Sequence, residues 1–172
     1  MLAAVRADLA ERLVKASELH GDFVLSSGRR SSVYFDKFRF LADPALLREL
    51  ASAVRELLPD GVTHLAAPEG AATLLLAAVA MDSGHPMVVV RKEPKTYGTR
   101  AQVEGLLEPG ARVALIEDVS TTGHQVEAAA RALETQGATV EAIVLALDRG
   151  GADALAAAGY LVRAVATLRP ER

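Results

Sequence analysis

Hydrophobic positions along the chain follow two alternating patterns, one with the helical period and one made of short unbroken runs. The helical period predicts helices at residues 2–19, 43–58, 71–82, 124–136 and 153–158. The apolar runs between them predict strands at residues 63–67, 87–90, 112–116, 140–147 and 160–166. Because fully apolar strands that alternate with helices are typical of covered parallel sheets, we expect an α/β fold with a central parallel sheet flanked by helices.

The N-terminal part departs from this alternation. The first predicted helix is followed by a break at Gly21 and by an extended segment at residues 23–40. Asp43 and Pro44 then form a typical helix start, an N-cap followed by Pro at the first helical position. We therefore expect a single domain over residues 1–172, in which residues 1–40 form a small flanking hood subdomain.

Composition narrows the functional classes. With 172 residues, 51% of them hydrophobic, the chain suits one globular domain, and its net charge of −3 gives no electrostatic footprint for nucleic acid. Without cysteine it has no disulfides or thiolate metal sites. Its longest apolar stretch, residues 71–81, is far shorter than the roughly 20 residues that span a bilayer. We expect a cytoplasmic protein that binds neither nucleic acid nor membrane.

The most informative segment is residues 113–125. Four apolar residues run directly into Glu117 and Asp118, and a turn of small residues at 120–123 leads into a helix. Backbone N–H groups of such a turn and helix N-terminus can hold a phosphate. The carboxylates would repel a phosphate, so they face sugar hydroxyls or a metal. A phosphorylated sugar satisfies both halves; the alternative is an ordinary turn with two solvated acids.

A basic segment is the second informative feature. Residues 91–100 contain four basic residues and a single acid, Glu93, inside a predicted polar loop at residues 91–105. A loop of this length in a compact domain is typical of a lid or a disordered connection, and its charge suits a pyrophosphate. A solvated charged loop is the alternative.

Residues 113–125 resemble the diphosphosugar-binding signature of the type I phosphoribosyltransferases, which bind 5-phosphoribosyl 1-diphosphate (PRPP). The resemblance implies the type I phosphoribosyltransferase-like fold, with Glu117 and Asp118 at the ribose 2- and 3-hydroxyls and residues 120–125 around the 5-phosphate. The PRPP-binding residues that it implies are Arg91, Lys92, Lys95, Glu117, Asp118, Val119, Ser120, Thr121, Thr122, Gly123, His124 and Gln125.

The basic segment narrows the family. Its pattern Arg-Lys-Glu-x-Lys-x-x-Gly resembles the catalytic loop of the orotate phosphoribosyltransferases. In that family the loop closes over the pyrophosphate of a neighbouring subunit's site, which implies a homodimer with the loop acting in trans. The catalytic residues implied are Lys95, Glu117 and Asp118. Tyr97 stands where many members have His.

Two further segments resemble the orotate branch. Residues 23–35 match its Phe-x-Leu-x-Ser-Gly-Arg…Tyr-Phe motif, with Ser26 where some members have a Lys; Arg29 or Arg30 could substitute for it. Arg149, which Gly150 and Gly151 follow where the family often has other residues, matches the arginine that binds orotate. The orotate-binding residues implied are Tyr34, Phe35, Thr121 and Arg149. Aromatic core packing and a surface salt bridge are the alternatives.

The reaction implied is orotate plus PRPP giving orotidine 5-monophosphate and pyrophosphate, in pyrimidine nucleotide biosynthesis. Mg²⁺ is the implied cofactor, held mostly by the diphosphate, the ribose hydroxyls and water. The four histidines have no metal-ligand spacing, so we predict no protein metal site. A purine phosphoribosyltransferase and a non-catalytic PRPP-sensing regulator are the rival interpretations.

Overall fold

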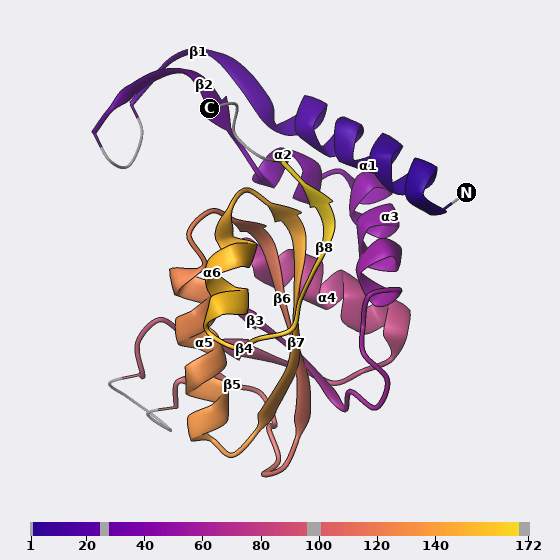
Figure 1. The fold of residues 1–172 in the computed structure, drawn as a ribbon, viewed down its shortest axis with the longest axis vertical. Coiled ribbons are helices and arrows are strands. Elements are labelled where there is room, and N and C mark those ends of the chain that lie inside the picture. The colour runs from indigo at the N-terminus through magenta and orange to yellow at the C-terminus, as the bar shows by residue number, and fades with distance from the viewer. Residues whose placement is uncertain (1, 25–27, 96–100, 169–172) are drawn as a thin grey trace.

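The computed structural model describes residues 2–24, 28–95 and 101–168 (Figure 1). In chain order, its elements are α1 (Leu2–Ser17), β1 (Glu18–Val24), β2 (Arg30–Phe35), α2 (Phe38–Leu41), α3 (Pro44–Arg55), β3 (His64–Pro68), α4 (Ala72–Ser83), β4 (Met87–Val90), β5 (Val103–Glu104), β6 (Arg112–Ser120), α5 (His124–Thr135), β7 (Thr139–Asp148), α6 (Gly151–Ala157) and β8 (Val162–Thr167).

The main sheet has six strands in the order β5-β4-β3-β6-β7-β8. All neighbouring pairs are parallel except β4 and β5, which are antiparallel. The predicted parallel sheet is thus confirmed, and β8 joins it beside β7. The two-residue strand β5 was not predicted, because it lies inside the segment that we expected to be loop throughout.

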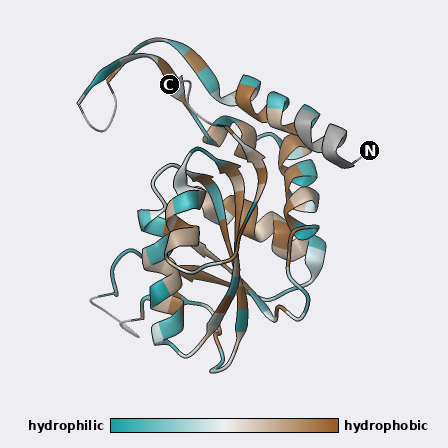
Figure 2. Cartoon of the chain, viewed as in Figure 1, coloured by the Kyte–Doolittle hydropathy of each residue, from teal (hydrophilic) through white to brown (hydrophobic). Residues whose placement is uncertain are grey.

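Alternate residues of the central strand β6 face opposite sides of the sheet. Ala114 and Ile116 belong to the core under α1, α3 and α4, whereas Val113 and Leu115 pack in the core under α5 and α6. All four side chains are buried, which is why the strand reads as an unbroken apolar run. Figure 1 shows helices on both faces of the sheet, and Figure 2 shows hydrophobic colour along much of its strands.

The N-terminal part forms a separate two-stranded hairpin, β1 and β2, which projects beyond the end of the main sheet (Figure 1). The predicted break at Gly21 was wrong, because Gly21 lies within β1 where the register shifts between His20 and Phe23. A local bulge accommodates this glycine without ending the strand. The predicted extended segment also turns into the short helix α2, whose Phe40 and Leu41 are buried in the core.

The start of α3 follows the prediction in detail. The Asp43 carboxylate accepts hydrogen bonds from the N–H groups of Ala45 and Leu46, at 2.9 and 3.1 Å, and Pro44 occupies the first turn. A cap of this kind contributes about 1 kcal/mol of helix stability. Within the described ranges, no helix is both long and apolar enough to cross a membrane.

Candidate active site

The acid pair, Glu117 and Asp118, lies near the C-terminal end of strand β6 and not in the loop that follows it. β6 continues to Ser120 and pairs with β7 as far as Asp148, so both acids are part of the sheet. The Glu117 side chain is 5% exposed and Asp118 is fully buried. The prediction that the strand ends at residue 116 was therefore wrong; charged residues hide a strand end from a pattern that looks for apolar runs.

Each acid has a defined partner. Asp118 Oδ1 lies 3.0 Å from the Lys37 ammonium and accepts the Val119 N–H at 2.7 Å. Glu117 Oε1 accepts the Asp118 N–H at 3.2 Å. The pKa of Glu117 is raised to about 9, mainly because the side chain is buried and in addition because Asp118 is next to it. At neutral pH Glu117 is therefore protonated and can donate a hydrogen bond, whereas Asp118 is ion-paired with Lys37.

The turn after the acid pair is shaped by glycine. Gly123 has a φ of +80° and precedes α5, and a side chain there would meet Gly151 O and the Leu155 Cγ, each at 3.0 Å. A Cβ on Gly151 would in turn lie 2.0 Å from Ser120 Oγ. The two glycines thus let the loop after β7 pack directly on the predicted phosphate loop, which explains the small residue at position 151.

The predicted phosphate loop is open to solvent where a phosphate would approach. Thr121, Thr122, His124 and Gln125 are exposed, whereas Gly123 is buried. The side chain of Ser120 is also buried, and its hydroxyl has no hydrogen-bond partner among the described residues. Because α5 begins at His124, the free N–H groups of its first turn lie next to this loop and favour an anion.

The described part of the basic segment folds back onto acidic residues. The Lys95 ammonium lies 2.6 Å from Glu104 Oε1 on β5, and Arg91 Nη1 lies 3.7 Å from Glu69 Oε2. Glu69 Oε1 also accepts the Lys92 N–H at 2.9 Å. Two carboxylates therefore hold this basic cluster in place. Tyr97, which stands where many family members have His, and Ser26, which stands where some have Lys, both lie outside the described residues.

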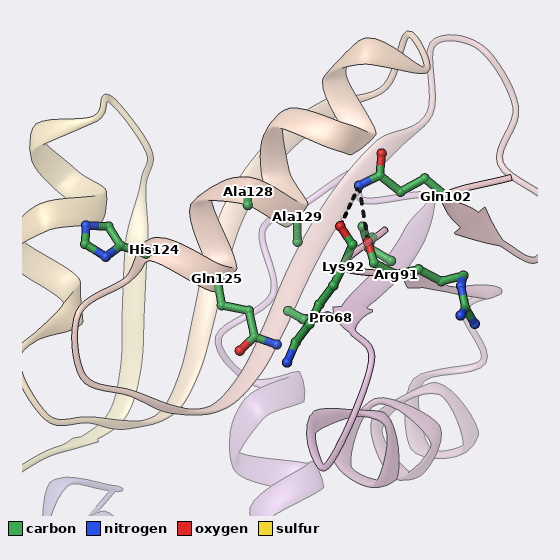
Figure 3. Close-up of a pocket in the computed structure, with 9 residues that line it drawn as sticks. Pro68, Arg91, Lys92, Gln102, His124, Gln125, Ala128 and Ala129 are labelled. Atoms are coloured by element: carbon green, nitrogen blue, oxygen red, sulfur yellow. Dashed lines mark hydrogen bonds between the residues drawn. The ribbon is translucent and has the colours of Figure 1, made fainter. Parts of the chain in front are cut away.

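A pocket of about 320 Å³ separates the start of α5 from the base of the basic segment. Its lining residues are Pro68, Val90, Arg91, Lys92, Gln102, His124, Gln125, Ala128 and Ala129. In Figure 3 the ends of the Lys92 and Gln125 side chains extend to the same side of the pocket, whereas the His124 ring extends away from it. The Gln102 amide donates to the Arg91 carbonyl at 3.2 Å and fixes the far wall. The pocket is large enough for a small phosphorylated ligand.

The predicted base-binding residues divide into two groups. The Arg149 guanidinium lies over the Phe35 ring, 4.8 Å from its centroid, and its backbone N–H donates to Ser120 O at 2.8 Å. Tyr34 instead contacts Phe23, with the ring centroids 5.5 Å apart. Neighbouring strand residues point to opposite faces, so β2 presents only one of its two aromatic residues to Arg149.

Comparison with known proteins identifies the family. Residues 40–162 match the model of the phosphoribosyl transferase domain. Over 163 residues the chain is 43% identical to an orotate phosphoribosyltransferase of Nocardioides, covering 94% of this chain and 91% of that protein. The chain belongs to the orotate phosphoribosyltransferase family. Both the fold and the family that the sequence motifs indicated are thereby confirmed.

Solved structures of orotate phosphoribosyltransferases agree. The Mycobacterium tuberculosis enzyme in complex with Fe(III) dicitrate has a TM-score of 0.84 and 33% identity, covering 95% of this chain and 96% of that one. The same enzyme in complex with PRPP has a TM-score of 0.79 and 30% identity, with coverage of 95% and 96%. An adenine phosphoribosyltransferase of Thermoanaerobacter pseudethanolicus, at 21% identity, TM-score 0.73 and coverage of 92% and 99%, shares the fold alone.

Sequence reasoning missed two charged residues at this orotate phosphoribosyltransferase site. Lys37 lies in a segment that read only as extended, and Glu104 lies on the unpredicted strand β5. No spacing pattern in the sequence connects Lys37 with Asp118 or Glu104 with Lys95. Glu104 could have been suspected only because it is the first acid after the basic run.

Proposed function

We propose that this orotate phosphoribosyltransferase joins orotate to PRPP, giving orotidine 5-monophosphate and pyrophosphate, with Arg149 and Phe35 binding the base. The supporting observation is the position of Arg149. Its backbone hydrogen bond to Ser120 anchors it to the phosphate loop, and its guanidinium covers Phe35. The groups suited to a carboxylated ring and those suited to a phosphorylated sugar are thus held next to one another.

PRPP binding is assigned to β6 and the turn after it. In this proposal the N–H groups of residues 121–125 hold the 5-phosphate, and Glu117 and Asp118 contact the ribose hydroxyls. A protonated Glu117 and the Asp118 carboxylate paired with Lys37 suit a diol, because each hydroxyl can both donate and accept a hydrogen bond. When the 5-phosphate and the ribose hydroxyls are both held, C1 is the part of the sugar that can still move during the reaction.

The reaction itself needs no protein nucleophile. The C1–O bond to the diphosphate breaks, and its electron pair leaves with pyrophosphate. The orotate N1 forms the new bond to C1, and its proton passes to solvent water. The protein contributes orientation of the two substrates and positive charge at the leaving group. We assign that charge to Arg91, Lys92 and Lys95. Arg91 must exchange Glu69, and Lys95 must exchange Glu104, for the diphosphate.

Mg²⁺ is proposed as a cation that arrives with the substrate. Among the described residues no group of three or more His, Cys, Asp or Glu side chains is arranged to hold a metal ion. The two acids nearest the ribose are buried, and one is paired with Lys37. This donor set suits a cation held by diphosphate oxygens, ribose hydroxyls and water, where it neutralises charge on the leaving group.

We further propose that the protein is cytoplasmic, where charged phosphate esters are retained. We also propose a homodimer in which Lys95 acts at the active site of the partner subunit. Mixing tests this. At an orotate concentration below the wild-type KM, Lys95→Ala and Arg149→Ala variants are each expected to be nearly inactive. Reassorted mixed dimers contain one intact site only if Lys95 acts in trans, which restores about a quarter of wild-type turnover. No recovery after verified subunit exchange would contradict the trans arrangement.

The activity is tested by ultraviolet absorbance of orotate with purified protein, PRPP and Mg²⁺. Adenine, hypoxanthine and uracil are run in parallel with product chromatography. Consumption of orotate that requires both PRPP and Mg²⁺ is the expected result. Turnover of another base but not orotate would overturn the assignment of Arg149 and Phe35. PRPP binding without turnover of any base would overturn catalysis and favour a regulator.

A further inference from the structure

Lys37 makes a contact that the assignments above leave without a role. Its ammonium lies 3.0 Å from Asp118 Oδ1, across a separation of 81 positions in the chain. The Asp118 side chain is 0% exposed, whereas 38% of the Lys37 side chain is exposed. Lys37 therefore touches a buried carboxylate of the ribose-binding pair and is itself reachable from solvent.

Asp118 depends on this contact. A buried carboxylate without a positive partner is strongly unfavourable, because water no longer solvates the charge. Asp118 Oδ1 has Lys37 and the Val119 N–H, while Oδ2 is buried and has no partner among the described residues. The neighbouring Glu117 cannot compensate this charge, because a carboxyl group is either neutral or negative. Within the part of the chain that the structure describes, Lys37 is thus the cation that pairs with Asp118.

The backbone on either side of Lys37 is fixed by packing. The Asp36 N–H donates to Ser17 O at 2.9 Å, and the Asp36 carboxylate accepts the Phe38 N–H at 3.1 Å. Phe40 and Leu41, which follow in α2, are buried in the main core. The hood segment therefore presents the Lys37 ammonium to β6 from a rigid base. Because the backbone at Lys37 is already fixed, only the Lys37 side chain loses entropy when its ammonium pairs with Asp118.

We propose that Lys37 is a positioning residue for PRPP: through its ion pair it holds the Asp118 carboxylate in the orientation that the ribose hydroxyls need. This inference rests on the proposed function, in which Asp118 contacts the ribose. Lys37 acts through Asp118, and its two remaining N–H donors are free to share the ribose oxygens as the sugar arrives. The hood segment thereby contributes to the sugar site as well as to the base site.

The binding test compares Lys37→Met with Lys37→Arg and with Lys15→Met, which removes an exposed ammonium elsewhere in the N-terminal part. PRPP binding is measured by calorimetry without orotate. Lys37→Met is expected to weaken PRPP binding by about tenfold to a hundredfold, because an interaction with a charged group is lost. Lys37→Arg is expected to restore most of the affinity, and Lys15→Met to match the wild type. Unchanged PRPP affinity in Lys37→Met would overturn the inference.

A double-mutant cycle with Asp118→Asn tests the contact itself through the free energy of unfolding, without any ligand. Lys37→Met is expected to destabilise the wild type but to have little effect on Asp118→Asn, where no buried charge needs a partner. Equal destabilisation in both backgrounds would mean that Lys37 acts only through its own packing, and would overturn the inference. A wild type that binds no PRPP would instead overturn the proposed function, while the cycle would still report the coupling of Lys37 to Asp118.

Discussion

The guanidinium of Arg149, at the end of β7, lies over the ring of Phe35, at the end of β2, with 4.8 Å between the Arg149 Cζ and the ring centroid. The contact joins the N-terminal hairpin to the rim of the main sheet. It orients the guanidinium and leaves its N–H groups to bind a ligand, since an aromatic face attracts a cation without using its donors.

Substitution of Arg149 should affect orotate much more than PRPP. Arg149→Ala is expected to raise the KM for orotate by about tenfold to a hundredfold, because a charge-assisted pair with the orotate carboxylate is lost. Arg149→Lys should recover only part of this, since an ammonium cannot form the bidentate pair. Steady-state kinetics with each substrate varied in turn gives the KM for orotate and the KM for PRPP separately. An equal loss of PRPP affinity would contradict the base-binding role.

Substitution of Lys95 should affect turnover. Lys95→Ala is expected to lower kcat by about a hundredfold or more, because charge that stabilises the departing diphosphate is removed. The fold should persist, since Lys95 pairs with Glu104 on β5, at the edge of the main sheet. Circular dichroism and thermal unfolding provide the control for folding. Near-normal kcat in a folded variant would refute the assigned role.

The acid pair predicts a particular pH dependence of stability. Burial raises the pKa of Glu117 to about 9, so between its unfolded value of about 4.3 and pH 9 the folded state holds a proton that the unfolded state has released. The contribution of Glu117 to the free energy of unfolding should therefore fall as pH rises through this window, by at most about 1.4 kcal/mol per pH unit.

Glu117→Gln isolates this effect, because glutamine cannot titrate while the groups acting on position 117, Asp118 and Lys37, stay in place. Urea unfolding of both proteins from pH 5.5 to 9 gives the difference in unfolding free energy at each pH. The wild type should lose stability relative to the variant as pH rises, and the difference should level off above pH 9. A difference that does not change with pH would mean that Glu117 is ionised in the folded protein.

The contact between the loop after β7 and the phosphate loop predicts the effect of Gly151→Ala. The added Cβ would lie 2.9 Å from Ser120 Cβ and 3.0 Å from Gly123 N, so the phosphate loop has to shift. We expect PRPP binding to weaken by about tenfold, because a displacement of this size disturbs oriented donors. Gly159→Ala is the matched control: its Cβ meets nothing within 4 Å, although its φ of +97° makes it strained. It should lower stability and leave PRPP affinity unchanged.

Much of the main sheet could be predicted because its signals are local. Each core strand is buried on both faces, so the apolar run at residues 113–116 indicates a strand whatever surrounds it. The acid pair and the phosphate loop are contiguous, so their order alone indicates a phosphorylated sugar. Strands β3, β4, β6 and β7 end at the same edge, which is why segments far apart in the sequence could be expected to meet there.

Residues whose role depends on a distant partner could not be found in this way. Nothing near Lys37 in the sequence indicates that it neutralises Asp118, and nothing near Glu104 indicates that it holds Lys95. The choice of Phe35 over Tyr34 as the partner of Arg149 depends on the register of β1 and β2 and the position of the hairpin. A shift of one residue would exchange their faces.

The sequence by itself determined the alternating helices and parallel strands of the main sheet and the family, because periodicity and contiguous motifs act over a few neighbouring residues. Only the tertiary structure decided the raised pKa of Glu117 and the ion pair between Asp118 and Lys37. Glu117 and Asp118 are buried on strand β6 within the main sheet, and the Lys37 ammonium reaches the Asp118 carboxylate across 81 positions of the chain. The energy of a charge depends on what surrounds it in space, and no local pattern carries that information.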